Sequence, residues 1–436
     1  MNAKLETVSW LNPPAAYLHV PFCAHHCGYC DFAVTAGSDH LIDHYLDAIA
    51  TELATLGAPR LVETIFIGGG TPTYPSVQQL DRLLTAVNRW LPLQDSGFRI
   101  RDSGARNPSF LNPGSRIPNP APEFSIESTP DSLTDEKAAI FAAHGGTRVS
   151  IGVQSFRPES LAALDRRHTA SQIPLAVEAV RKHGLHLSLD LIFAAPGSTL
   201  ATWAADLDAA IAFAPDHIST YGLTYEKGTP LWKQRRTGLV TAVSEDDELA
   251  MYELAIDRLS AAGFEHYEVS NFARPGFRTR HNEHYWANNA YYGFGVGAAR
   301  YVQGVRELNT RDTKAYIRKV LSGESPTFQT EQLEPRDRAF ETVGTQLRRR
   351  SGINRSQFHE QTGFQLDALL GNHLTQLLSL GLLGDDGQSV CLTPRGLVVA
   401  DGVIEELMKA NDGSTKGNLV PPVVRQFSFD TPRGGE

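Results

Sequence analysis

The stretch CAHHCGYCDF, from Cys23 to Phe32, decides the fold of this chain. It holds three of the four cysteines in 436 residues, and the fourth, Cys391, lies far away. The spacing C-x3-C-x2-C gathers three thiols in one short loop, and thiolates bind soft metals and iron–sulfur clusters. The segment HHCGY shows no apolar periodicity, so nothing in it favours three unliganded thiols buried as core.

Three thiolates rather than four indicate an incomplete ligand set. A [4Fe–4S] cluster normally takes four cysteines, so three leave one iron open to a small molecule. The alternative is a tetrahedral zinc site, for which His25, His26 or Asp31 would supply the fourth ligand. The spacing by itself leaves both sites open.

The composition is that of an ordinary soluble globular protein, 41% hydrophobic and 20% charged. The net charge of −9 argues against nucleic acid as a partner, because phosphate backbones bind basic surfaces. Four cysteines do not make a disulfide framework in so long a chain. The first residues do not read as a signal peptide, and no run of about 18 apolar residues predicts a membrane span. We therefore expect a cytoplasmic protein.

Working outward from the cysteines, apolar segments alternate with amphipathic ones. The predicted strands are 15–20, 63–69, 123–128, 148–154, 186–193 and 217–224. The predicted helices are 40–56, 76–90, 135–143, 158–167, 171–183 and 199–213. This alternation predicts an α/β fold with a parallel sheet, and six units favour a partial (β/α)6 barrel over a complete eight-fold one. Ligands should then gather at the carboxyl ends of the strands.

The remaining segments predict further units. We expect an N-terminal segment (1–14), the barrel (15–262), a β-rich extension (263–330), a helical winged-helix-like domain (331–410) and a disordered tail (411–436). Residues 94–122 are rich in Pro, Gly, Ser and Asn and predict a disordered surface insertion, with a lid or docking loop as the alternative. The winged-helix-like domain has no basic stretch beyond Arg348–Arg350, so we interpret it as a protein-packing module.

The segment YLHVPFCAHHCGYCDF, followed by IFIGGGTPT, resembles the radical S-adenosylmethionine (SAM) superfamily, and the resemblance covers roughly residues 15–405 without the insertion. It implies that Cys23, Cys27 and Cys30 hold a [4Fe–4S] cluster whose fourth iron binds the amino and carboxylate groups of SAM. One electron then cleaves a carbon–sulfur bond of SAM and produces a 5′-deoxyadenosyl radical, while protein groups orient the cofactor.

The resemblance also implies a SAM site. Glycines in GGGTP let the backbone approach the methionine part of SAM, Tyr29 would lie against adenine, and Glu127 would accept ribose hydroxyls. The SAM residues implied in this way are Tyr17, Tyr29, Gly69, Gly70, Thr71, Glu127, Gln154, Arg166, Asp190 and Thr224, with His19 in support. The alternative interpretation is a plain turn for the glycines and polar strand ends for the others.

Within the superfamily the chain resembles the oxygen-independent coproporphyrinogen III oxidases and their relatives, the haem chaperones of the HemW branch. The oxidase pattern has a further cysteine where Phe32 stands here, and a longer segment before the cysteines than the 22 residues present. HNEHYW (281–286) matches the H-N-x-x-Y-W motif of the HemW branch. It implies haem binding by His281 with Tyr285 and Trp286, or by His284, although such a cluster could instead only stabilise the fold.

The predicted function is therefore a haem chaperone that binds a [4Fe–4S] cluster, SAM and haem and delivers haem to respiratory haem proteins, without coproporphyrinogen oxidase activity. The alternative is the oxidase itself, a radical SAM enzyme of porphyrin biosynthesis that converts two propionates of coproporphyrinogen III to vinyl groups. A third alternative is a structural zinc protein. The resemblance leaves open a homodimer and peripheral contact with a membrane.

Overall fold

The computed structural model describes residues 12–93 and 122–411. Nearly all of the predicted insertion (94–122) and tail (411–436) lies outside these ranges, as does most of the predicted N-terminal segment. These three expectations therefore stay predictions. None of the helices in the described ranges is long and apolar enough to cross a bilayer.

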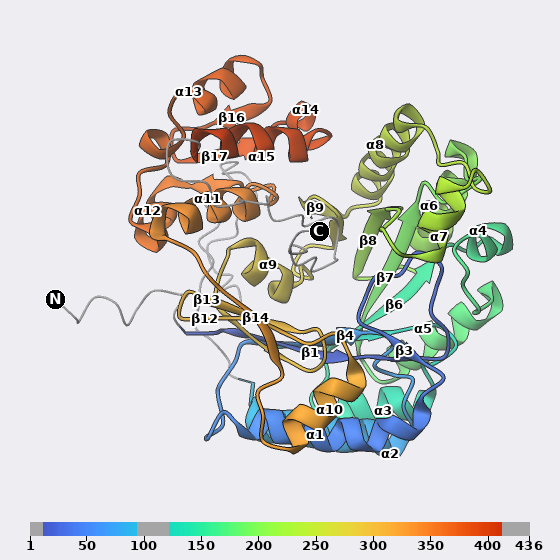
Figure 1. The fold of residues 1–436 in the computed structure, drawn as a ribbon. Coiled ribbons are helices and arrows are strands. Elements are labelled where there is room, and N and C mark those ends of the chain that lie inside the picture. Colours follow the sequence, from blue (N-terminus) through green and yellow to red (C-terminus); the bar gives the residue numbers. More distant parts are fainter. Residues whose placement is uncertain (1–11, 94–121, 412–436) are drawn as a thin grey trace, which may run out of the picture.

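A single curved sheet organises the described chain, and its centre is parallel (Figure 1). Six neighbouring strands run in the same direction: β1 (Ala15–Val20), β4 (Thr64–Gly69), β5 (Glu123–Ser128), β6 (Arg148–Gln154), β7 (His186–Phe193) and β8 (His217–Gly222). The predicted partial (β/α)6 barrel is confirmed, because each of the first five strands is followed by a helical connection that leads to the next parallel strand.

Helices cover the outer face of the sheet, as Figure 1 shows for α1, α2 and α3. The helices between the parallel strands are α1 (Ile42–Ala54), α2 (Val77–Trp90), α3 (Asp135–Ala143), α4 (Pro158–Ala163), α5 (Ile173–Lys182) and α6 (Leu200–Ala212). A capping box begins α2, since Ser76 and Gln79 each accept a hydrogen bond from the other's backbone N–H. Apolar strand residues such as Ile65, Phe124 and Val149 are buried beneath these helices.

The β-rich extension is divided between the two edges of the sheet. At one edge lie β10 (Asn271–Ala273) and β9 (Glu265–Glu268), and at the other lie β11 (Tyr291–Phe294), β12 (Ala299–Val302), β13 (Val305–Asn309) and β14 (Thr327–Gln332). The segment between the edges, which carries HNEHYW, forms the short helix α9 (Arg280–Trp286) rather than part of a β-rich stretch. Further helices are α7 (Pro230–Arg236), α8 (Glu245–Ala261) and α10 (Thr313–Leu321).

The C-terminal part has the element order of a winged helix. Its elements are α11 (Pro335–Gln346), β15 (Ile353–Asn354), α12 (Arg355–Thr362), α13 (Leu366–Ser379), β16 (Leu383–Asp385), β17 (Ser389–Leu392), α14 (Pro394–Leu397) and α15 (Ala400–Met408). Two of the three arginines after α11 join neighbouring elements: Arg348 pairs with Asp401, and the backbone N–H of Arg350 donates to Tyr267 O in β9. Cys391, the cysteine outside the N-terminal loop, is half-buried in β17.

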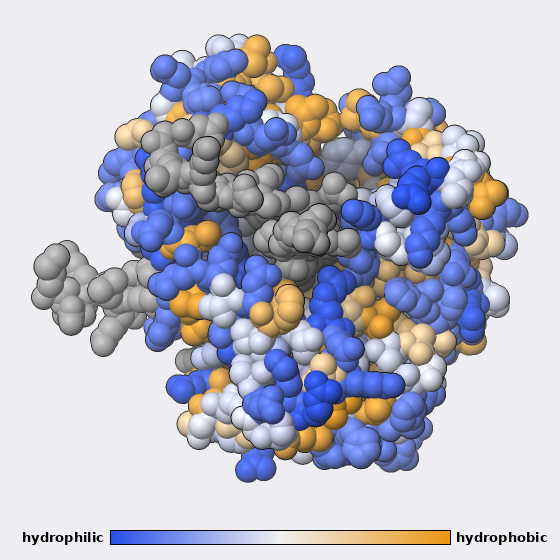
Figure 2. Space-filling view, viewed as in Figure 1, coloured by the Kyte–Doolittle hydropathy of each residue, from blue (hydrophilic) through white to orange (hydrophobic). Residues whose placement is uncertain are grey.

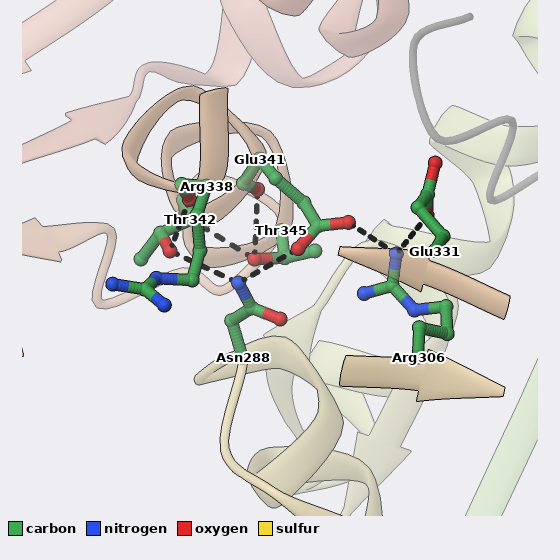
Figure 3. A network of polar contacts seen from close by, with 7 residues as sticks. All are labelled: Asn288, Arg306, Glu331, Arg338, Glu341, Thr342 and Thr345. Atoms are coloured by element: carbon green, nitrogen blue, oxygen red, sulfur yellow. Dashed lines mark hydrogen bonds and ion pairs between the residues drawn. The ribbon is translucent and has the colours of Figure 1, made fainter. Parts of the chain in front are cut away.

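A polar network joins this domain to the sheet edge (Figure 3). Asn288, just after α9, donates from Nδ2 to Glu341 Oε2 at 3.2 Å and to Thr342 Oγ1 at 2.9 Å, both in α11. Arg306 in β13 contacts Glu341 Oε1 at 2.6 Å and Glu331 Oε2 at 3.2 Å. The helix α9 is therefore held between the barrel and α11.

The surface is mostly hydrophilic on the face drawn in Figure 2, where hydrophobic side chains lie in small separate groups outside the grey parts. The apolar side chains instead fill a core that runs from the barrel helices to the C-terminal helices. The polar side chains of interest for function lie inside the curved sheet.

Candidate functional site

A pocket on the concave side of the sheet collects nearly all the predicted site residues. Its wall includes the following of them: Tyr17, Cys23, Cys27, Tyr29, Cys30, Gly69, Gly70, Thr71, Glu127, Gln154, Arg166, Asp190, Thr224, His281 and Tyr285. Trp286 does not line this pocket. It is buried, and the guanidinium of Arg348 lies 5.9 Å from the centre of its ring.

The cysteine loop is closed at its base by two short paired strands, β2 (Phe22–Cys23) and β3 (Thr35–Ala36). Thr71 Oγ1 donates to Cys23 Sγ at 3.5 Å, and Arg166 Nη1 donates to Cys27 Sγ at 3.6 Å. Donors placed at two of the three sulfurs stabilise thiolate charge. The loop therefore presents its sulfurs to the pocket with donors that stabilise them as thiolates, the form in which cysteine binds a metal.

Burial opposes that charge while no metal is bound. It raises the pKa of Cys23 to about 11 and the pKa of Cys30 to about 12. Both thiols are then protonated at neutral pH. Because a metal binds the thiolate, loading the loop must release these protons.

The glycine turn after β4 packs directly against the cysteine loop. A methyl group on Gly70 would lie 2.7 Å from Pro21 O and 2.8 Å from Cys23 Sγ, closer than atoms can approach. Gly69 has φ +116°, and a methyl group there would lie 2.7 Å from the ring of His19. The glycines are therefore required by the approach of two protein segments, a reason that the sequence analysis did not foresee.

His19 holds the other side of this junction. Its Nδ1 lies 3.0 Å from Tyr17 Oη, and its Nε2 lies 2.9 Å from Ala33 O in the cysteine loop. Burial lowers the pKa of His19 to about 4, so the ring is neutral at pH 7. The supporting role expected of His19 and Tyr17 fits this arrangement.

Two carboxyl groups of the pocket, Glu127 and Asp190, lie on β5 and β7, the two strands that flank β6. Gly69 N donates to Glu127 Oε2 at 2.9 Å, and Ser150 Oγ donates to Asp190 at 2.9 Å. Burial, with the charge of Asp190 as a smaller cause, raises the pKa of Glu127 to about 8. Burial also raises the pKa of Asp190 to about 6, against hydrogen bonds from serines. A ligand that offers hydroxyls or positive charge would find acceptors here.

Gln154 and Arg166 lie at the end of β6 and after α4. Gln154 has φ +64°, an unusual conformation for a residue other than glycine, and its Oε1 has no hydrogen-bond partner within the described ranges. Arg166 Nη2 donates to Gly152 O at 2.6 Å. Strained backbone and an unused polar atom often mark ligand sites.

Other polar residues on the inner face were missed by the sequence analysis. They are Arg148, Ser150, Ser188, His217, Ser219 and Asn282. A signal for most of them was present: polar residues alternate along R-x-S-x-G-x-Q (148–154), S-x-D (188–190) and H-x-S (217–219). Period-two alternation places such residues on one face of a strand.

Helix α9 closes the pocket beside β4. His281 Nδ1 lies 3.0 Å from Thr64 Oγ1, and its ring stacks on Phe66 with centroids 5.2 Å apart. The ring of Tyr285 meets the ring of His281 edge to face, with centroids 4.7 Å apart. His284 points elsewhere, with Nε2 3.5 Å from Glu63 Oε2 and Nδ1 3.2 Å from Asn289 Nδ2.

Comparison with known proteins places this geometry in a family. The model of the Radical SAM superfamily matches residues 17–210, and that of the HemN C-terminal domain matches residues 333–399. The heme chaperone HemW of Lactococcus lactis is 34% identical over 397 residues, which are 91% of this chain and 97% of the relative. This chain belongs to the HemW family of radical SAM proteins.

Another HemW relative and a solved structure agree. The heme chaperone HemW of Mycobacterium tuberculosis is 35% identical over 406 residues, 91% of this chain and 95% of its own. The coproporphyrinogen III oxidase HemN of Escherichia coli matches with a TM-score of 0.75 at 22% identity, over 91% of this chain and 90% of its own. The second likeness shows the shared fold alone.

Membership of the radical SAM superfamily implies a [4Fe–4S] cluster and SAM. The residues present fit a cluster, because three thiols line one pocket with donors at two of them. Across residues 12–93 and 122–411 no three His, Cys, Asp or Glu side chains are placed to hold a single metal ion. A [4Fe–4S] cluster does not need three ligands on one metal, since each thiolate binds a different iron. Of the three candidates for a zinc ligand, His25 and His26 contact Asp165 and Cys30 O, and Asp31 Oδ1 lies 3.8 Å from Arg311 Nη2.

Proposed function

We propose that this HemW-family protein is a haem chaperone: it binds haem together with a [4Fe–4S] cluster and SAM, and it passes haem to respiratory haem proteins. The observation that carries the proposal is His281. It is buried, it faces the pocket, and its Nε2 has no hydrogen-bond partner in the described part of the chain. The names of the HemW relatives support the same function.

His281 is suited to bind haem iron. Burial holds the pKa of His281 well below its usual range, so the imidazole is neutral. When Nδ1 carries the proton toward Thr64, Nε2 presents a lone pair to the pocket, and neutral imidazole is a common axial ligand of haem. The hydrogen bond at Nδ1 would also hold the ring orientation.

Aromatic side chains beside His281 suit a flat apolar disc. Phe66 stacks on His281 and on Tyr17, with centroids 5.2 Å and 6.3 Å apart. Tyr285 stands perpendicular to His281. We expect Phe66 to take the role that the sequence analysis gave to Trp286, since Trp286 is packed against the C-terminal domain instead.

The residues around the cysteine loop would serve the cluster and SAM. Cys23, Cys27 and Cys30 would ligate the cluster, which with SAM supplies one-electron chemistry when bound. Glu127, Gln154, Arg166 and Asp190 would orient SAM through hydroxyl and charge contacts, with the glycine turn and Thr71 at its methionine end. Phe32 stands where the oxidase pattern has a further cysteine, which favours a carrier over the oxidase.

Haem titration tests the proposal. Purified protein is mixed with haem, and the shift of the Soret band is followed for wild type, His281→Ala and His284→Ala. His284 is the matched control because it lies on the same helix but contacts Glu63 and Asn289. We expect His281→Ala to abolish the shift and His284→Ala to retain it. Absence of any shift for wild type at micromolar haem would refute the proposal.

Two further assays examine delivery and the alternative function. Haem-loaded protein mixed with an apo form of a respiratory haem protein should lose its Soret signature as the acceptor gains one. An anaerobic assay with SAM, reductant and coproporphyrinogen III should yield no protoporphyrinogen, and its formation would establish the oxidase instead. Light scattering with and without the cluster, and vesicle sedimentation, test the homodimer and the membrane contact that the resemblance left open.

A further inference from the structure

Arg148, the first residue of β6, is a buried charge that the site described above does not use. Its side chain lines the same pocket as His281, and only 5% of the residue is exposed. Burying a guanidinium without an anion costs several kcal/mol, so such groups are normally paired. Whether a protein group or a ligand pairs with Arg148 therefore depends on the donors, acceptors and charges around it.

Most of the hydrogen-bonding capacity of Arg148 is unused. Nη2 donates to Phe277 O at 2.9 Å and to Arg278 O at 3.4 Å. Nε and Nη1 have no hydrogen-bond partner within the described ranges, and within the same ranges no carboxylate forms an ion pair with Arg148. A guanidinium carries N–H groups that together bind carboxylates well. Three of these N–H groups remain available.

The titratable groups around Arg148 form no ion pair with it in the described part of the chain. Burial, with the charge of Arg148 as a smaller cause, lowers the pKa of His186 and of His217, so both rings are neutral at pH 7. The nearby carboxylate of Glu123 is occupied, since Oε1 accepts from Ser125 Oγ at 3.2 Å and Oε2 accepts from Arg280 N at 2.8 Å. Within the described ranges this end of the pocket therefore offers Arg148 no carboxylate at ion-pair distance.

Arg148 is tied to the helix that carries His281. The carbonyl groups that it contacts, those of Phe277 and Arg278, belong to the segment that leads into α9. His281 and Arg148 are thus parts of one wall, and each presents an unpaired nitrogen to the same pocket. One ligand with both a Lewis-acidic metal and a carboxylate would satisfy both residues, since the metal accepts the lone pair of His281 and the carboxylate accepts hydrogen bonds from Arg148.

We propose that Arg148 binds a propionate carboxylate of the haem whose iron is bound by His281. The assignment rests on the proposed function and adds to it the group that recognises the acidic edge of the porphyrin. The other carboxylate source at this pocket is the amino-acid end of SAM, and the experiment separates the two.

The experiment compares haem with haem dimethyl ester, which lacks both carboxylates, in wild type, Arg148→Gln and Arg148→Lys. Arg157→Gln is the matched control, because Arg157 is partly exposed and its Nη2 lies 3.8 Å from Glu159. We expect Arg148→Gln to weaken haem binding at least about tenfold and to bind both porphyrins equally. We expect the haem affinity of Arg148→Lys, which keeps the charge, to lie between those of wild type and Arg148→Gln. Arg157→Gln should behave as wild type.

The outcomes distinguish this inference from the proposed function. If wild type binds haem but Arg148→Gln binds it equally well, or if wild type binds haem and its ester equally, the role of Arg148 is refuted and the haem site stands. If wild type binds no haem, the proposed function fails and this assignment fails with it. If Arg148→Gln loses SAM binding and keeps haem binding, the carboxylate belongs to SAM, which also overturns the proposal. The ester comparison uses the unaltered protein, so it holds even where a variant folds poorly.

Discussion

Replacing Gly69 with alanine tests the contact between the glycine turn and the cysteine loop. Gly69 has φ +116°, and its added methyl group would lie 2.7 Å from the ring of His19. His19 cannot move aside cheaply, because both ring nitrogens are hydrogen bonded, to Tyr17 and to Ala33 O. Gly69→Ala should therefore strain the backbone and also displace the support of the cysteine loop.

The two costs can be separated with a second glycine. A residue with a side chain at positive φ costs about 1–2 kcal/mol, and overpacking a buried site costs about 1–3 kcal/mol more. Gly145, after α3, has φ +86°, and no atom of the described residues lies within 4 Å of an added methyl group, so Gly145→Ala should show the backbone cost alone. We expect Gly69→Ala to lower the free energy of unfolding by about 1–3 kcal/mol more than Gly145→Ala does.

The measurement is urea unfolding of both variants, followed by iron and sulfide content after anaerobic reconstitution. Gly69→Ala should bind less cluster than wild type, because the ring of His19 is bonded to Ala33 just beyond Cys30. Gly145→Ala should bind the same amount as wild type. Equal stability of the two variants, with equal cluster content, would refute the argument that the glycine is required by His19.

Three more predictions concern the cluster, the pH dependence of stability and the helix that carries HNEHYW. Alanine at any of the three N-terminal cysteines should abolish cluster reconstitution, whereas Cys391→Ala, in β17, should keep wild-type iron and sulfide; a full cluster in all three variants would contradict the ligand assignment. Burial raises the pKa of Glu268 from 4.5 to about 7. Between these two pH values the carboxyl stays protonated in the folded protein but not in the unfolded chain, so the free energy of unfolding falls by about 3 kcal/mol as the pH rises from about 4.5 to about 7. Glu268→Gln should remove that part of the loss in urea unfolding at pH 5 and pH 8, and an unchanged pH profile would show that the carboxyl is not the cause. Asn288 has φ +55° and donates two hydrogen bonds to α11. Asn288→Ala should therefore lower the free energy of unfolding by about 2–4 kcal/mol, and Asn288→Gly should lower it by about 1–2 kcal/mol less, since glycine accepts that φ. Equal losses for the two variants in thermal unfolding would argue against backbone strain.

Much of the barrel could be predicted because its signals are local. Strands 123–128, 148–154 and 186–193 have the predicted bounds, since each is a short segment of alternating apolar residues between clear helix signals. The predicted start of the helix over 76–90 agrees with α2, because a capping box of Ser76 and Gln79 is also a local signal. The order of strands and helices then implied which strand ends share an edge, and so which predicted site residues meet.

Elements that depend on distant partners were harder to predict. The aromatic residues of HNEHYW favour strands by propensity, but the segment forms α9 because it must pack between the barrel and α11, where Asn288 and Ala287 O are bound by the C-terminal domain. Trp286 was assigned to haem from its neighbours in sequence. A helix turns successive residues to different sides, and so His281 faces the pocket while Trp286 faces Arg348.

By itself, the sequence determined the parallel barrel, the three-thiol loop and the family to which the chain belongs, because these follow from local periodicity and from residue spacing within short segments. Only the tertiary structure decided why the glycines are needed, which nitrogen of His281 is available and that Arg148 forms no ion pair with any residue of the described ranges. These are properties of side chains brought together from strands far apart in the chain, and pairing, burial and the lack of a partner exist only once those strands have packed.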